Sequence, residues 1–354
     1  MTDKALQTIE EQRRIATLTG SMLDARTALR LCSSVPEKKN AARYTLAQVN
    51  EKAAFRAILY HLAKSLIGED DLPLGKGRTP TPISDVLFTV VYKVYSGISG
   101  RRFITDVREL NAFGFTSTAM SYNCIFDYLR KESFTEILMS LISMTAAPFS
   151  HIEQNFAADS TGFRIPKIHK WYDEKHGWRK RRQWIKGHIC VGVRSHIVAA
   201  VQVTPRSTGD SPVLPYLADS TLEGFQVKEI ATDGAYLSVK NLEHLDSAGI
   251  FPAIPFHSNH KLTSQPPDSV WRKMFYLFAM NSAEYQEQIN RQAQVESTFS
   301  MIKQKFGERI FSKDSVGQVN EVLCKILCHN LCVIIYWLYQ FGVELPEGPT
   351  DSII

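Results

Sequence analysis

The sequence predicts an α/β protein in which a mixed sheet is flanked by helices and preceded by an all-helical N-terminal region. Three observations lead to this fold class. The first part of the chain carries helical patterns and no strand-like segment. From about residue 149 onward, short β-branched segments alternate with helical ones. A hairpin comes before two strand–helix units, and hairpins pair antiparallel whereas crossover units pair parallel, so we expect both kinds of pairing in one sheet.

Length and composition describe an ordinary globular chain. With 354 residues, 44% of them hydrophobic and 22% charged, there is room for two or three domains and a sizeable core. This composition excludes a wholly disordered or collagen-like protein. The N-terminus lacks the apolar core of a signal peptide. The apolar stretch 322–341 contains Lys325, His329 and Asn330, so we expect a buried helix there and no contact with a membrane.

The cysteines permit two interpretations. None of the six forms a CxxC pair, but Cys324, Cys328 and Cys332 repeat every four residues along one helical stripe. With His329 nearby they could hold a metal ion. Thiols on one buried face more often act as small apolar packing residues.

The N-terminal half is expected to contain a helical arm over residues 1–67, a Gly- and Pro-rich linker over 68–82 and further helices over 83–148. Within the last region, a helix over 101–110, a turn containing Gly114 and a helix over 116–131 give the outline of a helix-turn-helix. In that motif, polar side chains from 117–123 would reach base edges in DNA. A plain helical bundle gives the same outline.

A catalytic domain is expected over 149–343, followed by a loose tail over 344–354. The expected strands are 155–165, a hairpin within 186–203, 227–232 and 250–255, and the expected helices are 211–221, 238–248, 271–280, 283–306 and 318–341. An RNase H-like fold has this order, with helices on the faces of a mixed sheet.

One expected helix, with the sequence RQAQVESTFSMIKQKFG over 291–307, carries two faces. Its apolar residues are Val295, Phe299, Ile302 and Phe306, which form one stripe. Glu296 and Lys303 are seven residues apart and therefore share the neighbouring edge. Such a pair usually belongs to a solvated flank. A function for it depends on whether other carboxylates meet Glu296.

Two aspartates lie where strands are expected to carry a site. Asp159 is within the first strand, and Asp233 directly follows the strand 227–232. If these strands are neighbours, both carboxylates reach one crevice at the sheet edge, and Glu296 would enter it from a packed helix. Taken singly, each acid could be a cap, a turn residue or a salt-bridge partner. Taken together, three oxygen ligands suit two Mg²⁺ or Mn²⁺ ions, which promote phosphoryl transfer.

The positive charge of the chain is local. The net charge of the whole chain is +5, but the segment 164–186 alone carries +7 and has tryptophan and tyrosine residues interleaved. This pattern suits a phosphate backbone, although a solvated loop with aromatic anchors is the alternative. The DNA contacts expected from this segment are Lys167, Lys170, Arg179, Lys180, Arg181, Arg182 and Lys186.

Three motifs together resemble the DDE transposases of bacterial insertion sequences: DSTGF around Asp159, TDGAY around Asp233 and QVESTFSMIKQKFG around Glu296. The similarity runs from about residue 155 to 330. It implies an RNase H-like domain with Asp159, Asp233 and Glu296 as the metal-binding catalytic triad. Lys303 matches the family's lysine near the DNA end. The family's arginine is expected at 292, where this chain has glutamine, and Arg291 lies one place earlier.

The resemblance implies a DNA transposase that cuts transposon ends and joins them to target DNA with Mg²⁺ or Mn²⁺. Its partners would be terminal inverted repeats and target DNA, with Lys303 and Arg291 added to the contacts of the basic segment. Because two ends must be brought together, we expect a homodimer, in the cytoplasm of a bacterium and associated with its nucleoid. The alternatives are a nuclease of the same fold without strand transfer and a transposase-derived DNA-binding protein without catalysis.

Overall fold

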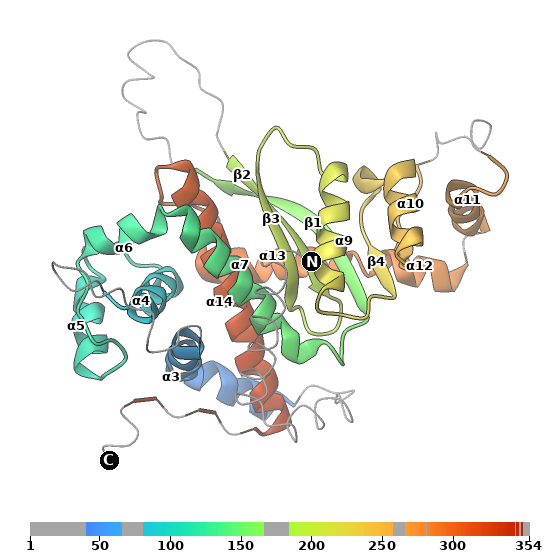
Figure 1. Cartoon of the computed structure of the whole chain (residues 1–354). Coiled ribbons are helices and arrows are strands. Elements are labelled where there is room, and N and C mark those ends of the chain that lie inside the picture. Colours follow the sequence, from blue (N-terminus) through green and yellow to red (C-terminus); the bar gives the residue numbers. More distant parts are fainter. Residues whose placement is uncertain are drawn as a thin grey trace, which may run out of the picture. The chain divides into compact units, whose positions relative to one another are not determined.

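A computed structural model describes residues 40–65, 81–165, 184–257, 266–280, 282–343, 345–346 and 348–349. The chain forms two compact units, which Figure 1 colours along the sequence. Unit 1 contains Met1–Pro148 together with Asp314–Ile354, and unit 2 contains Phe149–Lys313. The arm expected before residue 40, most of the linker 68–82 and much of the tail 344–354 lie outside the described residues.

Unit 2 is built on one mixed sheet, in the order β3-β2-β1-β4-β5. The strands are β1 (Asn155–Arg164), β2 (Trp184–Gly192), β3 (Val198–Pro205), β4 (Glu229–Ala231) and β5 (Phe251–Ala253). The first three strands pair antiparallel, whereas β4 is parallel to β1 and β5 is parallel to β4. The predicted hairpin, the mixed sheet and the RNase H-like order of strands are therefore confirmed.

Helices cover both faces of this sheet (Figure 1). Unit 2 contains η2 (Ser211–Val213), α9 (Leu214–Leu222), η3 (Gly234–Tyr236), α10 (Val239–Ser247), α11 (Val270–Met280), α12 (Ala283–Asn290) and α13 (Ala293–Phe306). Phe156 of β1 packs edge-on against Phe225, which follows α9. Thr161 of β1 instead receives a hydrogen bond from Lys303 of α13. Side chains alternate between the two faces of a strand, so Phe156 and Thr161, which are five residues apart, point to opposite faces. α9 and α13 therefore cover opposite sides of β1.

The segment expected to form one helix over 283–306 is two helices. α12 ends at Asn290 and α13 begins at Ala293, so the chain breaks at Arg291 and Gln292. The predicted apolar stripe of α13 is confirmed, since Val295, Phe299, Ile302 and Phe306 are all buried. The glycine stop signal is confirmed as well, because Gly307 has a positive φ of 74° directly after the helix.

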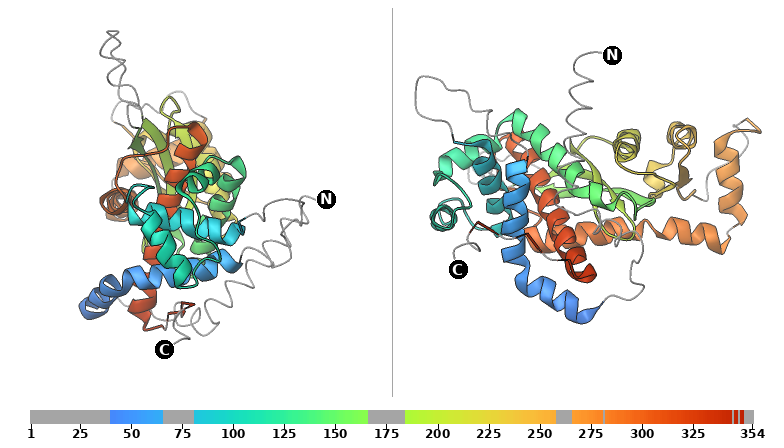
Figure 2. Two further views of the ribbon diagram at one scale, coloured as in Figure 1. Left: turned by 90° about the vertical axis from the view of Figure 1, so that its left-hand side faces the viewer. Right: turned by 60° about the horizontal axis from the view of Figure 1, so that its bottom comes forward.

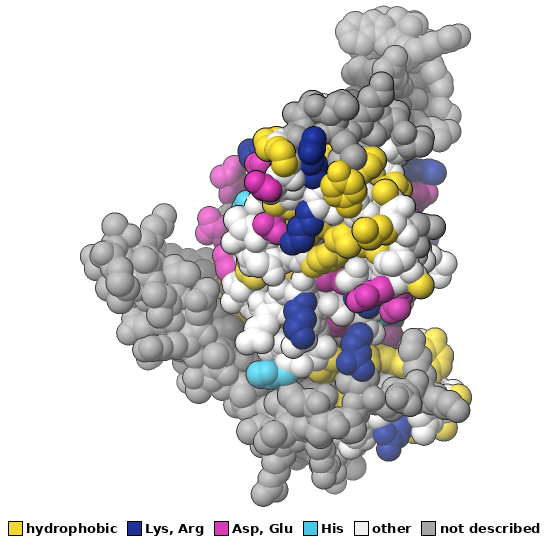
Figure 3. Space-filling model, turned by 90° about the vertical axis from the view of Figure 1, so that its right-hand side faces the viewer, with side chains coloured by type: hydrophobic (Ala, Val, Ile, Leu, Met, Phe, Trp, Pro, Cys, Tyr) yellow, Lys and Arg dark blue, Asp and Glu magenta, His cyan; other side chains and the backbone are white. Residues whose placement is uncertain are grey.

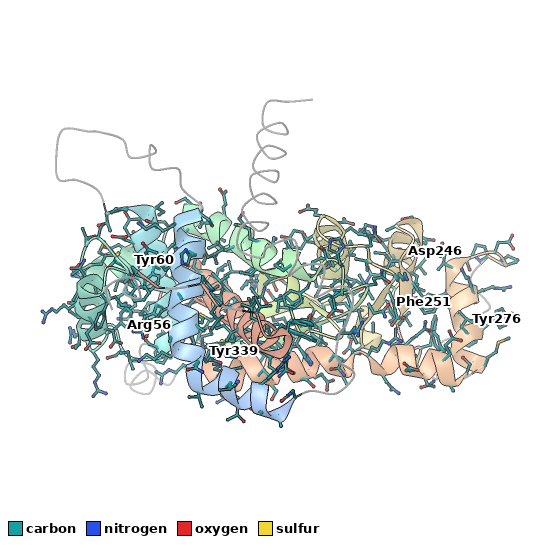
Figure 4. All side chains as sticks on the ribbon, turned by 90° about the horizontal axis from the view of Figure 1, so that it is seen from below. Arg56, Tyr60, Asp246, Phe251, Tyr276 and Tyr339 are labelled. Carbon is teal, nitrogen blue, oxygen red and sulfur yellow. The ribbon has the colours of Figure 1, made fainter. Side chains whose placement is uncertain are left out.

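α11 extends unit 2 beyond the sheet with a strongly apolar surface. Met274 is its only fully buried residue, while Tyr276 is 49% exposed and Met280 is 75% exposed. Figure 3 shows hydrophobic side chains gathered on this side of the molecule. Figure 4 labels Tyr276 on α11, with Asp246 and Phe251 on the neighbouring elements. α11 therefore contributes much of its apolar area to the surface rather than to a core.

Unit 1 is a bundle of helices, shown from two further sides in Figure 2. Its elements are α3 (Ala41–Ser65), α4 (Ile83–Ser96), α5 (Ile104–Ala112), α6 (Tyr122–Leu129), α7 (Glu132–Ala146), η1 (Ala147–Phe149) and α14 (Ser315–Phe341). α14 packs along α7 and against α3 and α4. The predicted N-terminal helical region is confirmed over the residues that the structure describes.

The structure groups α14 with unit 1. From the sequence, this helix was expected in the catalytic domain 149–343. Buried polar residues explain this grouping. Asn320 donates to the backbone oxygens of Leu129 and Lys131, between α6 and α7. Asn330 donates to Thr145 of α7 at 3.1 Å. Each buried amide needs these partners, so they hold the helix to this bundle.

Burial inside the protein explains why α14 is long and apolar. By length and composition this helix could cross a membrane, but most of its apolar stretch is buried inside the protein. Cys324 and Cys328 are completely buried on it. Among the described residues, no group of three His, Cys, Asp or Glu side chains is arranged to hold a metal ion. The burial of Cys324 and Cys328 therefore fits the packing interpretation of the cysteine stripe.

The expected helix-turn-helix differs from the structure. The connection 113–121 between α5 and α6 is longer than the three- or four-residue turn of that motif. Two residues expected to contact bases are exposed, but their backbone amides are bound within the helical bundle. Ser117 and Thr118 donate backbone hydrogen bonds, at 2.7 and 3.1 Å, to the fully buried carboxylate of Asp85 on α4. Ser121 is an N-cap that accepts from the amide of Cys124.

Candidate active site

Asp159 lies in the middle of β1, opposite Ile189 of β2. It shares a strand face with Thr161, two residues further along, and that face is covered by α13. β1 is a central strand with neighbours on both sides. At Asp159 itself the strand pairs with β2, whereas its pairing with β4 ends two residues earlier, at Ala157.

Asp233 follows β4 after one intervening residue and begins the turn η3. Its Oδ1 accepts a hydrogen bond of 2.9 Å from the amide of Ala235, as an N-cap does. β4 is the parallel neighbour of β1. The two aspartates therefore lie on adjacent strands, at the edge where the sequence predicted a crevice.

Glu296 is in the first turn of α13 and its side chain is exposed. Its Oε1 accepts a hydrogen bond of 3.1 Å from Gln292, one turn earlier. This carboxylate is the least constrained of the three, because its partner is a flexible and partly exposed amide.

The other acidic side chains act on Asp159. Its pKa is raised from 3.8 to about 6, mainly by burial and in addition by the charges of Asp233, Asp210 and Glu296. A hydrogen bond from the amide of Ser160 opposes this shift. Charges act in this way only over short distances within a protein. Asp233 and Glu296 are therefore near enough to Asp159 for their charges to act on its carboxyl group.

This donor set fits Mg²⁺ or Mn²⁺ in kind. It supplies carboxylate oxygens alone, which these ions prefer, and its mutual repulsion would be relieved by a cation. Within the described part of the chain, no three such side chains already surround a common point. Binding of an ion would therefore require the side chains to converge, and the exposed Glu296 is the one with room to move.

Lys303 lies beside this site on the last turns of α13. Its Nζ donates a hydrogen bond of 2.6 Å to Thr161 Oγ1 and lies 5.8 Å from the centre of the Phe163 ring. Burial lowers the pKa of its ammonium group. On the predicted edge of α13, Lys303 is therefore turned toward β1, whereas Glu296 is exposed.

A fourth carboxylate, Asp210, was missed by the sequence reasoning. Its Oδ1 accepts hydrogen bonds of 2.8 Å from Ser160 Oγ and from Lys186 Nζ. Burial raises the pKa of Asp210, but the hydrogen bonds and the charge of Lys186 outweigh this effect and bring the pKa below its usual range. The signal in the sequence was the segment TPRSTGD, which ends at this residue.

His188 of β2 lies in the same polar cluster and is fully buried. Its Nε2 is 2.8 Å from Thr204 Oγ1, and its Nδ1 is 3.7 Å from Asp210 Oδ1. Burial lowers the pKa of His188 to about 4, although the charge of Asp210 opposes the shift. The imidazole is therefore neutral in the folded protein at physiological pH.

The buried imidazole predicts acid-sensitive stability. Between its unfolded pKa of about 6.5 and its folded pKa of about 4, the unfolded chain binds a proton that the folded chain does not, so stability falls as the pH falls. We expect this residue to cost about 2 kcal/mol between pH 7.5 and 5. Urea unfolding of the parent and of His188→Gln at both pH values measures the effect. An equal loss in both proteins would contradict the prediction.

Two of the predicted DNA-binding residues have acidic partners within unit 2. Arg291 Nη1 lies 2.9 Å from Oε2 of the nearly buried Glu229, and Lys186 is paired with Asp210. Their charges are therefore largely compensated inside the protein. The other residues expected to contact DNA, Lys167, Lys170, Arg179, Lys180, Arg181 and Arg182, lie outside the described residues.

Comparison with known proteins yields two similarities. The family model described as "Transposase DDE domain" matches residues 151–331, which is just over half of the chain. Among solved structures, the chain is similar to a piggyBac transposase in a synaptic complex with hairpin DNA. The identity is 10%, the TM-score is 0.40, and the alignment covers 95% of this chain and 78% of that chain.

Proposed function

Because the chain belongs to the family of transposase DDE domains, we propose that it is a DNA transposase that cuts transposon ends and joins them to target DNA. Asp159, Asp233 and Glu296 are the proposed catalytic carboxylates. One observation carries this assignment: beyond the effect of burial, the pKa of Asp159 is raised by the charges of Asp233 and Glu296. Perturbed carboxylates that gather at a sheet edge are typical of a functional site.

Asp159 and Asp233 would hold the ions between them, a role supported by their positions on β1 and just after its parallel neighbour β4. Glu296 would complete the set from α13. Two divalent ions held there would activate the attacking oxygen and stabilise the leaving oxygen of an in-line displacement at a phosphodiester. Asp159, Asp233 and Glu296 would hold these ions, whose positive charge would offset the repulsion between the carboxylates and the phosphate. Lys303, whose ammonium group lies over β1, would contact the DNA backbone next to it.

The test is metal-dependent cleavage of plasmid DNA that carries the element's own ends, in Mg²⁺ and in Mn²⁺. We expect the parent to cut at the ends and to join the products to target DNA. Glu296→Gln and Asp233→Asn should each lose more than about a hundredfold in rate, because removing even a hydrogen-bond partner of a metal ligand costs up to that much. Glu284→Gln, an exposed carboxylate on α12, is the matched control and should cut like the parent.

Other outcomes would support the alternatives or reject the assignment. Cutting without joined products would indicate a nuclease of the same fold. Specific DNA binding without Mn²⁺ binding would indicate a protein that has lost catalysis. Cleavage by Glu296→Gln at the rate of the parent would reject Glu296 as a catalytic residue.

The basic segment predicts how DNA binding depends on salt. Arg179→Gln with Arg182→Gln should weaken binding and reduce the slope of log affinity against log salt by up to about 2, since each phosphate contact contributes about 0.9. Lys240→Gln with Lys273→Gln removes the same charge from exposed sites on α10 and α11 and should leave the slope unchanged. Fluorescence anisotropy with labelled duplex measures both. Equal slopes for the two variants would place the DNA contact elsewhere.

A further inference from the structure

The loop between β3 and η2 touches both aspartate-bearing elements of the candidate active site. Asp210 accepts a hydrogen bond of 2.8 Å from the hydroxyl of Ser160, the residue that directly follows Asp159 on β1. The amide of the same serine donates to the carboxylate of Asp159. Ser160 therefore connects Asp210 to Asp159 through one residue of a central strand.

The next residue along the chain, Ser211, is linked through Asn241 to the turn that carries Asp233. Asn241 Nδ2 lies 2.9 Å from the backbone oxygen of Ser211 and 2.8 Å from that of Tyr236. Tyr236 closes the turn that begins at Asp233, with a hydrogen bond of 3.3 Å between its amide and the Asp233 oxygen. Asn241 is only 2% exposed. Asp210, the last residue of the loop, is thus linked to Asp159 through Ser160, and Ser211, the first residue of η2, is linked to the Asp233 turn through Asn241 and Tyr236.

Lys186 holds the loop from a third side. Its Nζ lies 2.8 Å from Asp210 Oδ1 and 3.1 Å from the backbone oxygen of Thr208. The side chains of Lys186 and Asp210 are 20% and 25% exposed, so water screens this pair only in part. The ammonium group also compensates the charge of Asp210, which lies close to the acidic site.

Asp210 is not a candidate for the same role as Asp159. Ser160 and Asp159 are consecutive in β1, so their side chains leave opposite faces of the strand. Asp210 meets the Ser160 face, whereas Asp159 shares the face of Thr161, which α13 covers. The contacts of Asp210 are therefore those of a group that orients a neighbour.

We propose that Asp210 is a positioning residue, which fixes the placement of Asp159 relative to Asp233 through Ser160 on one side and the Ser211–Asn241 contacts on the other. The proposal rests on the proposed function, because it concerns the same acidic site. Partners behind a metal ligand typically change metal affinity by about 10- to 100-fold when they are removed.

The test measures the affinity of the full chain for Mn²⁺ by calorimetry. MnCl₂ is the probe, and no DNA is present. We expect Asp210→Ala and Ser160→Ala each to weaken Mn²⁺ binding about tenfold, and Ser160→Thr, which keeps the hydroxyl, to bind like the parent. The double variant Ser160→Ala/Asp210→Ala should be no weaker than either single variant, because both act through one hydrogen bond. Asp219→Ala removes an exposed carboxylate of α9 and is the control.

Two comparisons make the outcome decisive. Thermal unfolding in EDTA identifies any variant that has lost its fold. If Asp210→Ala is unfolded, Asp210→Asn, which keeps the size of the side chain, is used in its place. Asp159→Asn is titrated alongside. If Asp159→Asn binds Mn²⁺ like the parent, the proposed function fails. If Asp159→Asn loses binding while Asp210→Ala, Asp210→Asn and Ser160→Ala keep the parent's affinity, only the positioning role is overturned.

Discussion

Arg291→Met is expected to destabilise unit 2 by about 2–3 kcal/mol, because it leaves the carboxylate of Glu229 buried without its partner. Glu229 has a side chain only 4% exposed and lies 2.9 Å from the guanidinium, which is 25% exposed. Burial raises the pKa of Glu229, and the charge of Arg291 opposes that shift. The loss should fall on β4, where Glu229 is the first residue. Amide hydrogen exchange of β4 and β1 under native conditions measures it.

Two further variants separate this explanation from a general effect of losing an arginine. Glu229→Gln/Arg291→Met should recover at least half of the loss, since no uncompensated charge is then buried. Arg164→Met breaks an ion pair with Glu308 of similar length, 3.1 Å, whose side chains are 62% and 42% exposed, and should cost less than about 0.5 kcal/mol. A double variant as unstable as Arg291→Met would contradict the assigned cause.

Asp159→Asn is expected to make the metal-free protein more stable at pH 7.5, by about 1–2 kcal/mol. The pKa of Asp159 is raised from 3.8 to about 6. Between pH 3.8 and pH 6, Asp159 is ionised in the unfolded chain but still protonated in the folded one, so the free energy of unfolding falls as the pH rises. Above pH 6 it stays at this lower level. The amide carries no charge and avoids the cost. At pH 4 the parent and the variant should therefore be nearly equal in stability.

Mn²⁺ should reverse the ranking. An ion that binds only the folded protein adds about 2.7 kcal/mol when present at about one hundred times its dissociation constant. The parent should gain this stability and Asp159→Asn should gain much less. Asp246→Asn, on the exposed side of α10, should follow the parent within about 0.5 kcal/mol in both conditions. If Mn²⁺ stabilises the parent and Asp159→Asn equally, Asp159 is not a metal ligand.

Local patterns in the sequence predicted much of unit 2. The stripe Val295, Phe299, Ile302 and Phe306 identified the buried face of α13, because helical periodicity reflects burial directly. The alternation of β-branched residues identified the β2–β3 hairpin. Each of these signals is formed by residues that are close together in the sequence, so it can be recognised without knowledge of the tertiary fold.

The features that the sequence did not reveal depend on partners that are distant in sequence. The ion pair of Arg291, an expected DNA contact, with Glu229 joins residues sixty-two positions apart, and the helix break beside Arg291 was not expected. Asp210 was missed because only the pairing of β1 with β2 brings Ser160 and Lys186 to the same loop. Asn320 and Asn330 likewise bond to α7 and to the residues between α6 and α7, which are nearly two hundred positions earlier in the chain.

The grouping of α14 with α3, α4 and α7 has a consequence for the order in which the chain can fold during synthesis. Unit 2 is one continuous segment and is complete once Lys313 has left the ribosome. Unit 1 is not, because the helix that packs along α7, α3 and α4 is made last. Its N-terminal helices therefore carry unburied apolar faces throughout the synthesis of unit 2. The half of the protein that is begun first can be completed only after the other half is made.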